Sequence, residues 1–209
     1  RRGQPAVARV MAVVDSDQPD VIIDRLQPVA DVAPMYDQSV VITSYASIMA
    51  NAQGRGDHDG QGEPSARSGL IEHITPEFAA AAARLIQSGA VYLSQIRSVG
   101  GAVSDVDPDA TAYGNRSANF SVTAFGANRE RLNTAWDEVY EYLDGLYLSF
   151  ETDLRSERLG DAFPPRTIER LRGLKSRYDP DNVFRDNFNI APRAPTGHGL
   201  DLSAQRSLR

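Results

Sequence analysis

Residues 119–143, NFSVTAFGANRERLNTAWDEVYEYL, place a strand pattern directly before a helix pattern. In Asn119–Phe125 apolar and polar residues alternate, which is typical of a half-buried β-strand. From Asn128 to Leu143 the large apolar residues recur at spacings of four, three and four, which puts them on one face of a helix. They are Leu132, Trp136, Val139 and Leu143. A strand that leads into an amphipathic helix predicts a sheet with a helix packed on one of its faces.

Similar patterns on both sides of this segment extend the arrangement. Valine-rich or alternating segments predict further strands at 6–14, 68–73 and 91–97. Helix patterns, one of them opened by an N-cap threonine and a proline, cover 19–32, 42–51, 75–87 and 165–178. The connections between Val91 and Phe125 are hairpin-like, so neighbouring strands should run antiparallel. We predict an α+β fold, with an antiparallel sheet of about five to seven strands and helices mainly on one face.

The composition is that of a soluble globular domain. The chain has 209 residues, of which 41% are hydrophobic and 24% charged. The net charge is -6 without a block of like charges, which argues against nucleic acid or an anionic membrane surface as a partner. No apolar run approaches the length that crosses a bilayer, so we expect no membrane partner. These features do not fix the compartment, and a cytoplasmic location is the one that we favour.

Residue types and local motifs exclude several kinds of site. The absence of cysteine excludes disulfides, thiolate metal sites, cysteine nucleophiles and a cysteinyl flavin link within the chain. His58, His73 and His198 lack the HxxxH or HxH spacing of a metal site, so we expect no metal. The pair Gly100-Gly101 is typical of a turn and belongs to no nucleotide-binding motif. By local chemistry alone the chain is a soluble α+β domain without an assigned role.

The segment Leu174–Ile190, LKSRYDPDNVFRDNFNI, carries the most specific signal in the chain. Asp179-Pro180 should end the preceding helix, and Asn182 suits a turn. The segment resembles the terminal signature of berberine-bridge-type FAD-linked oxidoreductases, in the vanillyl-alcohol-oxidase-like superfamily. That signature is a helix followed by YDPxNxF-R-x-N-x-N-I.

Four upstream segments resemble the same family, in the same order along the chain. They are SARSGLI at 65–71, VGGAV at 99–103, DATAYGNR at 109–116 and YLSF at 147–150. Two positions depart from the family pattern, because Asn115 stands where histidine is common and Ser149 where asparagine is usual. The resemblance covers residues 6–192 and implies the C-terminal, substrate-binding half of such an enzyme.

The resemblance implies a two-part enzyme of which this chain contains the second part. Residues 1–150 would form the substrate-binding domain, 151–192 the segment that returns to the FAD domain, and 193–209 a polar tail. FAD would be held mainly by a domain absent from this chain, so that domain, in cis or as a separate chain, is the expected partner. We expect the chain alone to bind no FAD tightly and to lack activity. A sheet face without its partner would favour a homo-oligomer.

In such enzymes a small-molecule substrate, an alcohol, sugar or amine, is oxidised by hydride transfer to the flavin while a protein group removes a proton. Because Phe150 stands where a tyrosine base is common, the resemblance implies Tyr147 as the candidate catalytic base and Tyr113 as a weaker one. Tyr147, Ser149 and Asn189 are the residues expected to contact the cofactor. The alternative is a free-standing, non-catalytic binding module or a dimerising relic of the domain, which the changes at Ser149 and Phe150 favour.

Overall fold

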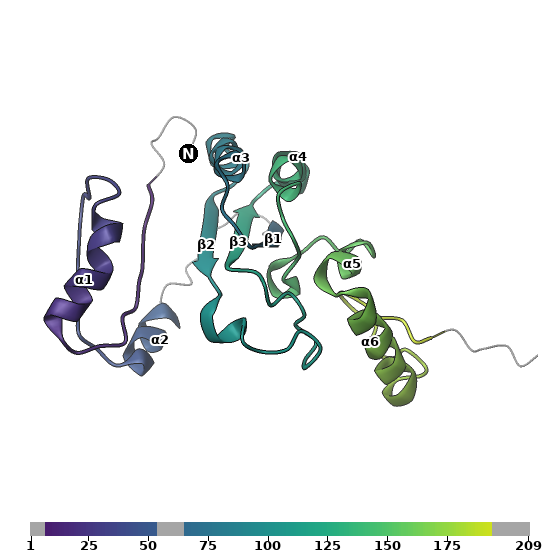
Figure 1. Cartoon of the computed structure of the whole chain (residues 1–209). Helices are drawn as coiled ribbons and strands as arrows, with labels where there is room; N and C mark the ends of the chain where they lie inside the picture. Colours follow the sequence, from purple (N-terminus) through teal and green to yellow (C-terminus); the bar gives the residue numbers. More distant parts are fainter. Residues whose placement is uncertain (1–6, 54–64, 194–209) are drawn as a thin grey trace, which may run out of the picture. The chain divides into compact units, whose positions relative to one another are not determined.

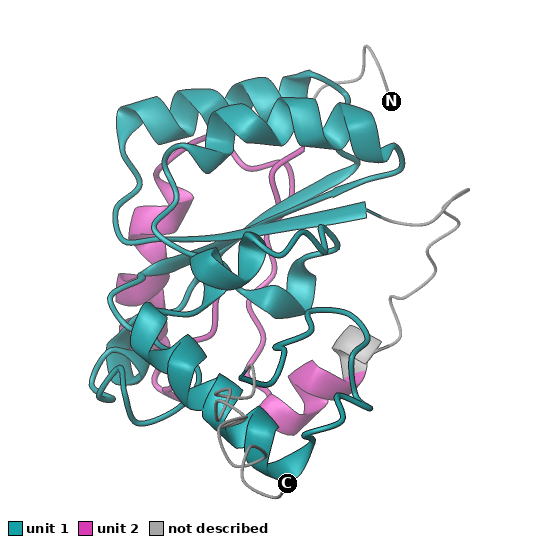
Figure 2. Ribbon diagram, turned by 90° about the vertical axis from the view of Figure 1, so that its right-hand side faces the viewer, with its two compact units in different colours: residues 1–2, 61–209 teal, residues 3–60 magenta. Residues whose placement is uncertain are grey.

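The computed structural model describes residues 7–53 and 65–193. These residues form two compact units that divide at residue 60 (Figure 2). The predicted division at residue 150 is a different boundary and stays a prediction. The polar tail predicted at 193–209 lies, apart from Arg193, outside the described residues.

The unit that comes first along the chain is magenta in Figure 2 and is called the first unit here; the teal unit that follows it is the second. The first unit contains helix α1, Pro19–Ala30, and helix α2, Tyr45–Gln53 (Figure 1). Pro19 opens α1 as predicted, because its fixed φ and missing N–H suit the first turn of a helix. The strand predicted at 6–14 is wrong, since residues 7–14 form none. A strand needs a neighbour for its backbone hydrogen bonds, and the described residues of this unit offer no second strand. Residues 12–15 instead line a hollow of about 430 Å³ together with α1.

The second unit is built on a three-stranded antiparallel sheet in the order β1-β3-β2 (Figure 1). Its strands are β1, Ser65–Ile71, β2, Leu93–Ser98, and β3, Phe120–Gly126. The α+β class and the antiparallel sheet are thereby confirmed. The expectation of about five to seven strands is wrong for the described residues, where three of the predicted segments pair and the valine-rich segment near the N-terminus does not.

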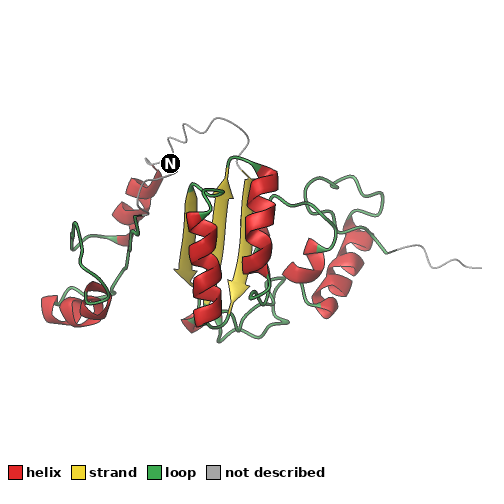
Figure 3. Ribbon diagram, turned by 90° about the horizontal axis from the view of Figure 1, so that it is seen from above, coloured by secondary structure: helices red, strands yellow, loops and turns green. Residues whose placement is uncertain are grey.

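Two long helices, α3, Pro76–Gln87, and α4, Arg129–Tyr140, cover one face of this sheet (Figure 3). α3 begins where the sequence predicts because the Thr75 side chain accepts a hydrogen bond from the backbone N–H of Phe78, at 3.2 Å. Its first turn also contains Pro76 and an acidic residue, both of which favour a helix N-terminus.

The hydrophobic core lies between the sheet and these two helices. Its central side chains are at most 3% exposed and come from β1, β3, α3 and α4: Ile71, Phe78, Ala81, Leu85, Val122, Ala124, Leu132, Trp136 and Val139. Each large side chain among them contributes about 1.5–3 kcal/mol through burial. β1 approaches the chain after α4 closely at Gly69, where an added Cβ would lie 2.2 Å from Leu143 Cδ1.

Four further elements complete the second unit. They are the 3-10 helices η1, Gly101–Val103, and η2, Leu148–Phe150, and the helices α5, Arg158–Ala162, and α6, Pro165–Tyr178. The last has the predicted bounds, and Asn182 adopts the left-handed conformation of the predicted turn, with φ 52°. Within the described residues, no helix is both long and apolar enough to cross a membrane. The same residues contain no group of side chains suited to hold a metal ion.

Candidate functional site

The register of the sheet separates a closed face from an open face. Val122 and Ala124 of β3 belong to the core under the helices, so the residues between and beside them face the other way. Thr123 pairs with Ser68 on β1 and with Gln95 on β2, which places all three on the face opposite α3 and α4. We call this the open face because neither α3 nor α4 covers it, although only its β2 residues, such as Gln95, are exposed. The hydroxyls of Ser68 and Thr123 are buried there, with no hydrogen-bond partner among the described residues.

Four aromatic rings form a chain of neighbouring contacts that begins on the open face. Phe125 of β3 meets Phe150 edge to face, with ring centroids 6.3 Å apart. Phe150 lies 5.8 Å from Tyr147, and Tyr147 lies 6.3 Å from Tyr113 in a second edge contact. We call these four residues the aromatic row. The structure thus brings together the two tyrosines that the sequence singled out, and Tyr147 remains 38% exposed.

The surroundings of Tyr113 do not suit a proton acceptor at neutral pH. Partial burial raises the pKa of Tyr113, and this outweighs the opposite effect of the Arg116 guanidinium, which lies 4.9 Å from the ring centroid. A phenolate base needs a lowered pKa instead. Of the two tyrosines, Tyr147 is the better placed to meet a substrate because it is the more exposed.

Two arginines stack on rings of the aromatic row, but their hydrogen bonds differ. Arg97 of β2 lies 4.7 Å above the Phe150 ring centroid, and its Nε donates to Gln95 at 3.0 Å. All three guanidinium nitrogens of Arg116 donate to oxygens of the loop 103–113. Within the described part of the chain, no carboxylate forms an ion pair with either arginine.

A buried ion pair ties down the turn that carries Tyr147. Glu151 directly follows η2, and its carboxylate lies 3.0 Å from Arg67 Nη1 on β1, with both side chains at most 2% exposed. The same carboxylate accepts hydrogen bonds from the backbone N–H groups of Ser68, Thr152 and Asp153. Burial raises the pKa of Glu151 and lowers the pKa of Arg67, because removal from water disfavours both charged forms. Forming the pair therefore costs free energy of desolvation, but it fixes the position of Glu151 and of the turn before it.

Asp153 extends this network to α5. Its carboxylate accepts hydrogen bonds from Arg155 and Arg158, and the Arg155 partner holds its pKa well below the usual range. The Arg158 guanidinium also lies 4.4 Å from the ring centroid of Tyr140 at the end of α4. No sequence pattern described above indicated these buried charges. The available signal was Arg67, the one charged residue in a strand of mostly small side chains.

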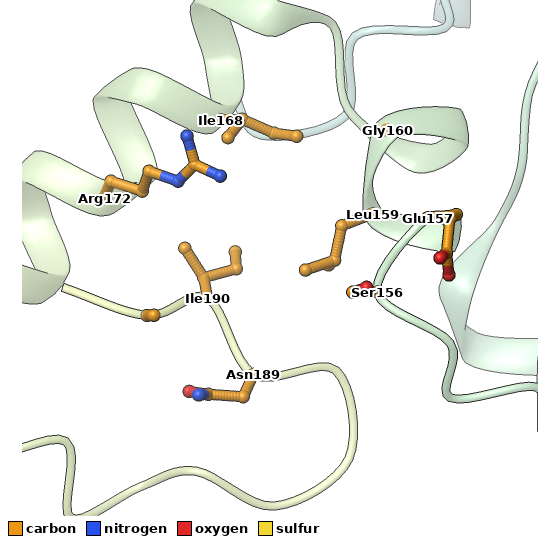
Figure 4. A pocket seen from close by; sticks show the side chains of 9 residues that line it. Ser156, Glu157, Leu159, Gly160, Ile168, Arg172, Asn189 and Ile190 are labelled. Atoms are coloured by element: carbon orange, nitrogen blue, oxygen red, sulfur yellow. The ribbon is translucent and has the colours of Figure 1, made fainter. Parts of the chain in front are cut away.

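Of the remaining predicted site residues, Ser149 adjoins the aromatic row in sequence, and Asn189 lies elsewhere in the second unit. Ser149 is exposed within η2. Asn189 lines a hollow of about 390 Å³ beside α5 and α6, into which the side chains of Leu159, Ile168 and Ile190 converge (Figure 4). Its Oδ1 is buried and has no hydrogen-bond partner among the described residues. The cofactor contacts expected of Tyr147, Ser149 and Asn189 stay predictions.

Comparison with known sequences identifies the terminal segment. The family model described as berberine and berberine like matches residues 162–191, which confirms the resemblance seen at 174–190. The uncharacterized FAD-linked oxidoreductase YgaK of Bacillus subtilis is 33% identical over 114 residues, covering 46% of this chain and 23% of that protein. The FAD-linked oxidoreductase sorD of Penicillium rubens is 28% identical over 118 residues, covering 49% and 24%. The chain thus spans about a quarter of the length of these curated relatives.

Solved structures share the fold over more of the chain. A chitooligosaccharide oxidase superimposes with a TM-score of 0.68 and 17% identity, over 84% of this chain and 44% of that one. At this identity the likeness shows the fold, a small antiparallel sheet with helices that matches part of a larger oxidase.

Proposed function

Because the chain is related to the berberine-bridge-type FAD-linked oxidoreductases, we propose that it forms the substrate-binding part of such an enzyme, which oxidises a small alcohol, sugar or amine. The observation that carries the proposal is the contrast between the two faces of the sheet. α3 and α4 cover the core residues of β1 and β3 on one face, whereas the other face carries Phe125, from which the aromatic row leads to the 38% exposed Tyr147. Small-molecule sites combine an apolar lining with a few placed polar groups, as this face does.

The residues of this chain fit a contribution to a flavin site. Tyr147 and Ser149 are exposed residues with a hydroxyl group, and the buried Oδ1 of Asn189 lacks a partner among the described residues. These are the three residues that we expect to contact FAD, with most of the cofactor held by an FAD-binding domain of the kind that family members carry. The chemistry that FAD supplies when bound is the acceptance of a hydride.

We assign to Tyr147 the role of the base that removes a proton from the substrate. Phe150 has no atom that accepts a proton, and the raised pKa of Tyr113 disfavours its phenolate. The contact with Phe150 and the buried Arg67–Glu151 pair hold the turn of Tyr147 in one conformation. Fixed orientation of a proton acceptor is part of general base catalysis, because the acceptor must lie within hydrogen-bond reach of the substrate.

Replacing Tyr147 by phenylalanine tests this proposal. In the flavin-loaded enzyme that contains this chain, we expect Tyr147→Phe to slow flavin reduction about 100-fold or more, since a general base contributes that much. The measurement is flavin absorbance in anaerobic stopped-flow experiments. Tyr113→Phe is the matched control, with the same loss of a hydroxyl and an expected change of less than about threefold. An unchanged rate in Tyr147→Phe would remove Tyr147 from the mechanism.

Exposed apolar side chains support an FAD-binding domain as the partner. In the segment after α6, Val183 is 70% exposed and Phe184 is 82% exposed. A large contiguous apolar patch on a surface marks an interaction site, and we propose that these two neighbouring side chains belong to one. The alternative occupant is a second copy of this chain, which sedimentation of the purified protein distinguishes from a complex with an FAD-binding domain.

A non-catalytic binding module is the second candidate function. The sequence favours it at two positions, since Ser149 replaces the asparagine that is usual in the family and Phe150 stands where a tyrosine base is common. Flavin content and intact mass of the protein isolated from its natural source separate the two candidates. Equimolar flavin together with an FAD-binding domain supports the enzyme, and a flavin-free chain of this size supports the module.

A further inference from the structure

We infer that Arg97 binds a carboxylate of the substrate, so that the substrate class is a ring-shaped alcohol with a negatively charged group. This inference rests on the proposed function and specifies the ligand of the same open face. It assigns a specificity role to a residue that the sequence analysis did not single out.

Arg97 is held in place, and it has hydrogen-bond donors without a partner among the described residues. Its partner in β3 is Ser121, which puts its side chain on the open face. Stacking on Phe150 and the hydrogen bond from Nε to Gln95 fix the plane of the guanidinium. Its Nη1 and Nη2 have no hydrogen-bond partner within residues 65–193. A planar guanidinium with two free nitrogens matches the geometry of a carboxylate.

Arg116, in the same region, differs from Arg97 because its hydrogen bonds serve the fold. It also stacks on a ring of the aromatic row, at 4.9 Å from the Tyr113 centroid. Its Nε, Nη1 and Nη2, however, each donate to a loop oxygen, so the side chain clamps the loop that carries Tyr113. Arg97 makes no such clamp, and its unused donors point to a ligand rather than to the fold.

The position of Arg97 relates it to the candidate base. Arg97 stacks on Phe150, and the Phe150 ring lies 5.8 Å from Tyr147. A substrate ring that packs on these aromatics can place its alcohol at Tyr147 and its carboxylate at Arg97. The whole chain carries a net charge of -6, which repels anions. An anion can therefore be preferred at this face only if a positive charge such as that of Arg97 lies close to it.

A matched pair of small alcohols tests the inference without flavin. The probes are 4-(hydroxymethyl)benzoate and 4-methylbenzyl alcohol, which differ in a carboxylate against a methyl group. Binding to the 209-residue chain is measured by saturation-transfer NMR. We expect the carboxylate to bind about threefold to tenfold more tightly, the range for a charge-assisted hydrogen bond at an exposed site. Added salt should reduce this preference.

Two variants locate the effect. Arg97→Gln should abolish the preference, because the charge is lost while the stem remains. Arg84→Gln is the control, since it makes the same charge change on α3, behind the closed face. Circular dichroism checks that both variants keep the fold. The inference is overturned by equal binding of the two probes, by binding of neither, or by a preference that Arg97→Gln leaves intact. Because the readout involves no flavin, these outcomes are independent of the rate of flavin reduction that tests the proposed function.

Discussion

The two edge strands of the sheet each contain an arginine, and the two arginines have opposite surroundings. Arg67 of β1 lies on the side of α4, is 1% exposed and is paired with Glu151. Arg97 of β2 lies on the open face, is exposed and has no carboxylate partner among the described residues. A buried charge must be paired because desolvation is costly, whereas an exposed charge remains available to a ligand. The two edge strands of one small sheet thus differ, because β1 holds a buried, paired arginine and β2 an exposed one without a carboxylate partner among the described residues.

The largest effect is expected from a cavity in the closed layer. Trp136 is 1% exposed and lies at the centre of the core. Trp136→Ala should lower the free energy of unfolding by about 3–5 kcal/mol, through lost burial and the cavity that remains. Tyr147 belongs to the aromatic row and is 38% exposed, so Tyr147→Ala should lower the free energy of unfolding by about 1 kcal/mol. Urea unfolding followed by circular dichroism measures both, and equal losses would contradict the distinction between the faces.

Breaking the buried ion pair should have the next largest effect. Arg67→Met leaves the Glu151 carboxylate buried without its charge partner, so we expect a loss of about 3 kcal/mol at neutral pH. The control Arg84→Met removes the exposed partner of Glu138 and should cost less than about 1 kcal/mol.

The loss in Arg67→Met should depend on pH with a definite sign. Burial already raises the folded-state pKa of Glu151 above its ordinary value of 4.5, and removing Arg67 raises it further. A raised folded pKa makes stability fall as the pH rises through it, so the variant should recover stability on acidification toward 4.5. A loss that is constant from neutral to acidic pH would contradict an ionised Glu151 in the native protein.

The smallest effect is expected at the buried hydroxyls of the open face. The Oγ of Ser68 and the Oγ1 of Thr123 have no partner among the described residues. Removing an unpaired polar group costs no hydrogen bond, so Ser68→Ala and the shape-preserving Thr123→Val should change the free energy of unfolding by less than about 0.5 kcal/mol. Thermal unfolding of both variants tests this, and a loss above about 1 kcal/mol would show that a bound water or other group satisfies these hydroxyls.

Local patterns predicted the regular elements of the second unit well. The helix at 165–178 has the predicted bounds, and the strands at 91–97 and 119–125 lie within two residues of β2 and β3. These segments succeed because caps, alternation and helical spacing are local properties of the chain. The segment 6–14 fails because its valines favour a strand only where another strand provides hydrogen bonds.

The candidate site divides in the same way. The sequence by itself determined the α+β class, the helix that ends at Tyr178, and the terminal signature that indicates the family. Only the tertiary structure decided that Tyr113 and Tyr147 meet, that Glu151 neutralises Arg67, and that Asn189 lies in a separate hollow. The physical reason is the distance along the chain over which each interaction acts. Capping and periodicity act within a few residues, whereas these contacts join residues tens of positions apart, and the register of the sheet, which no local pattern specifies, brings them together.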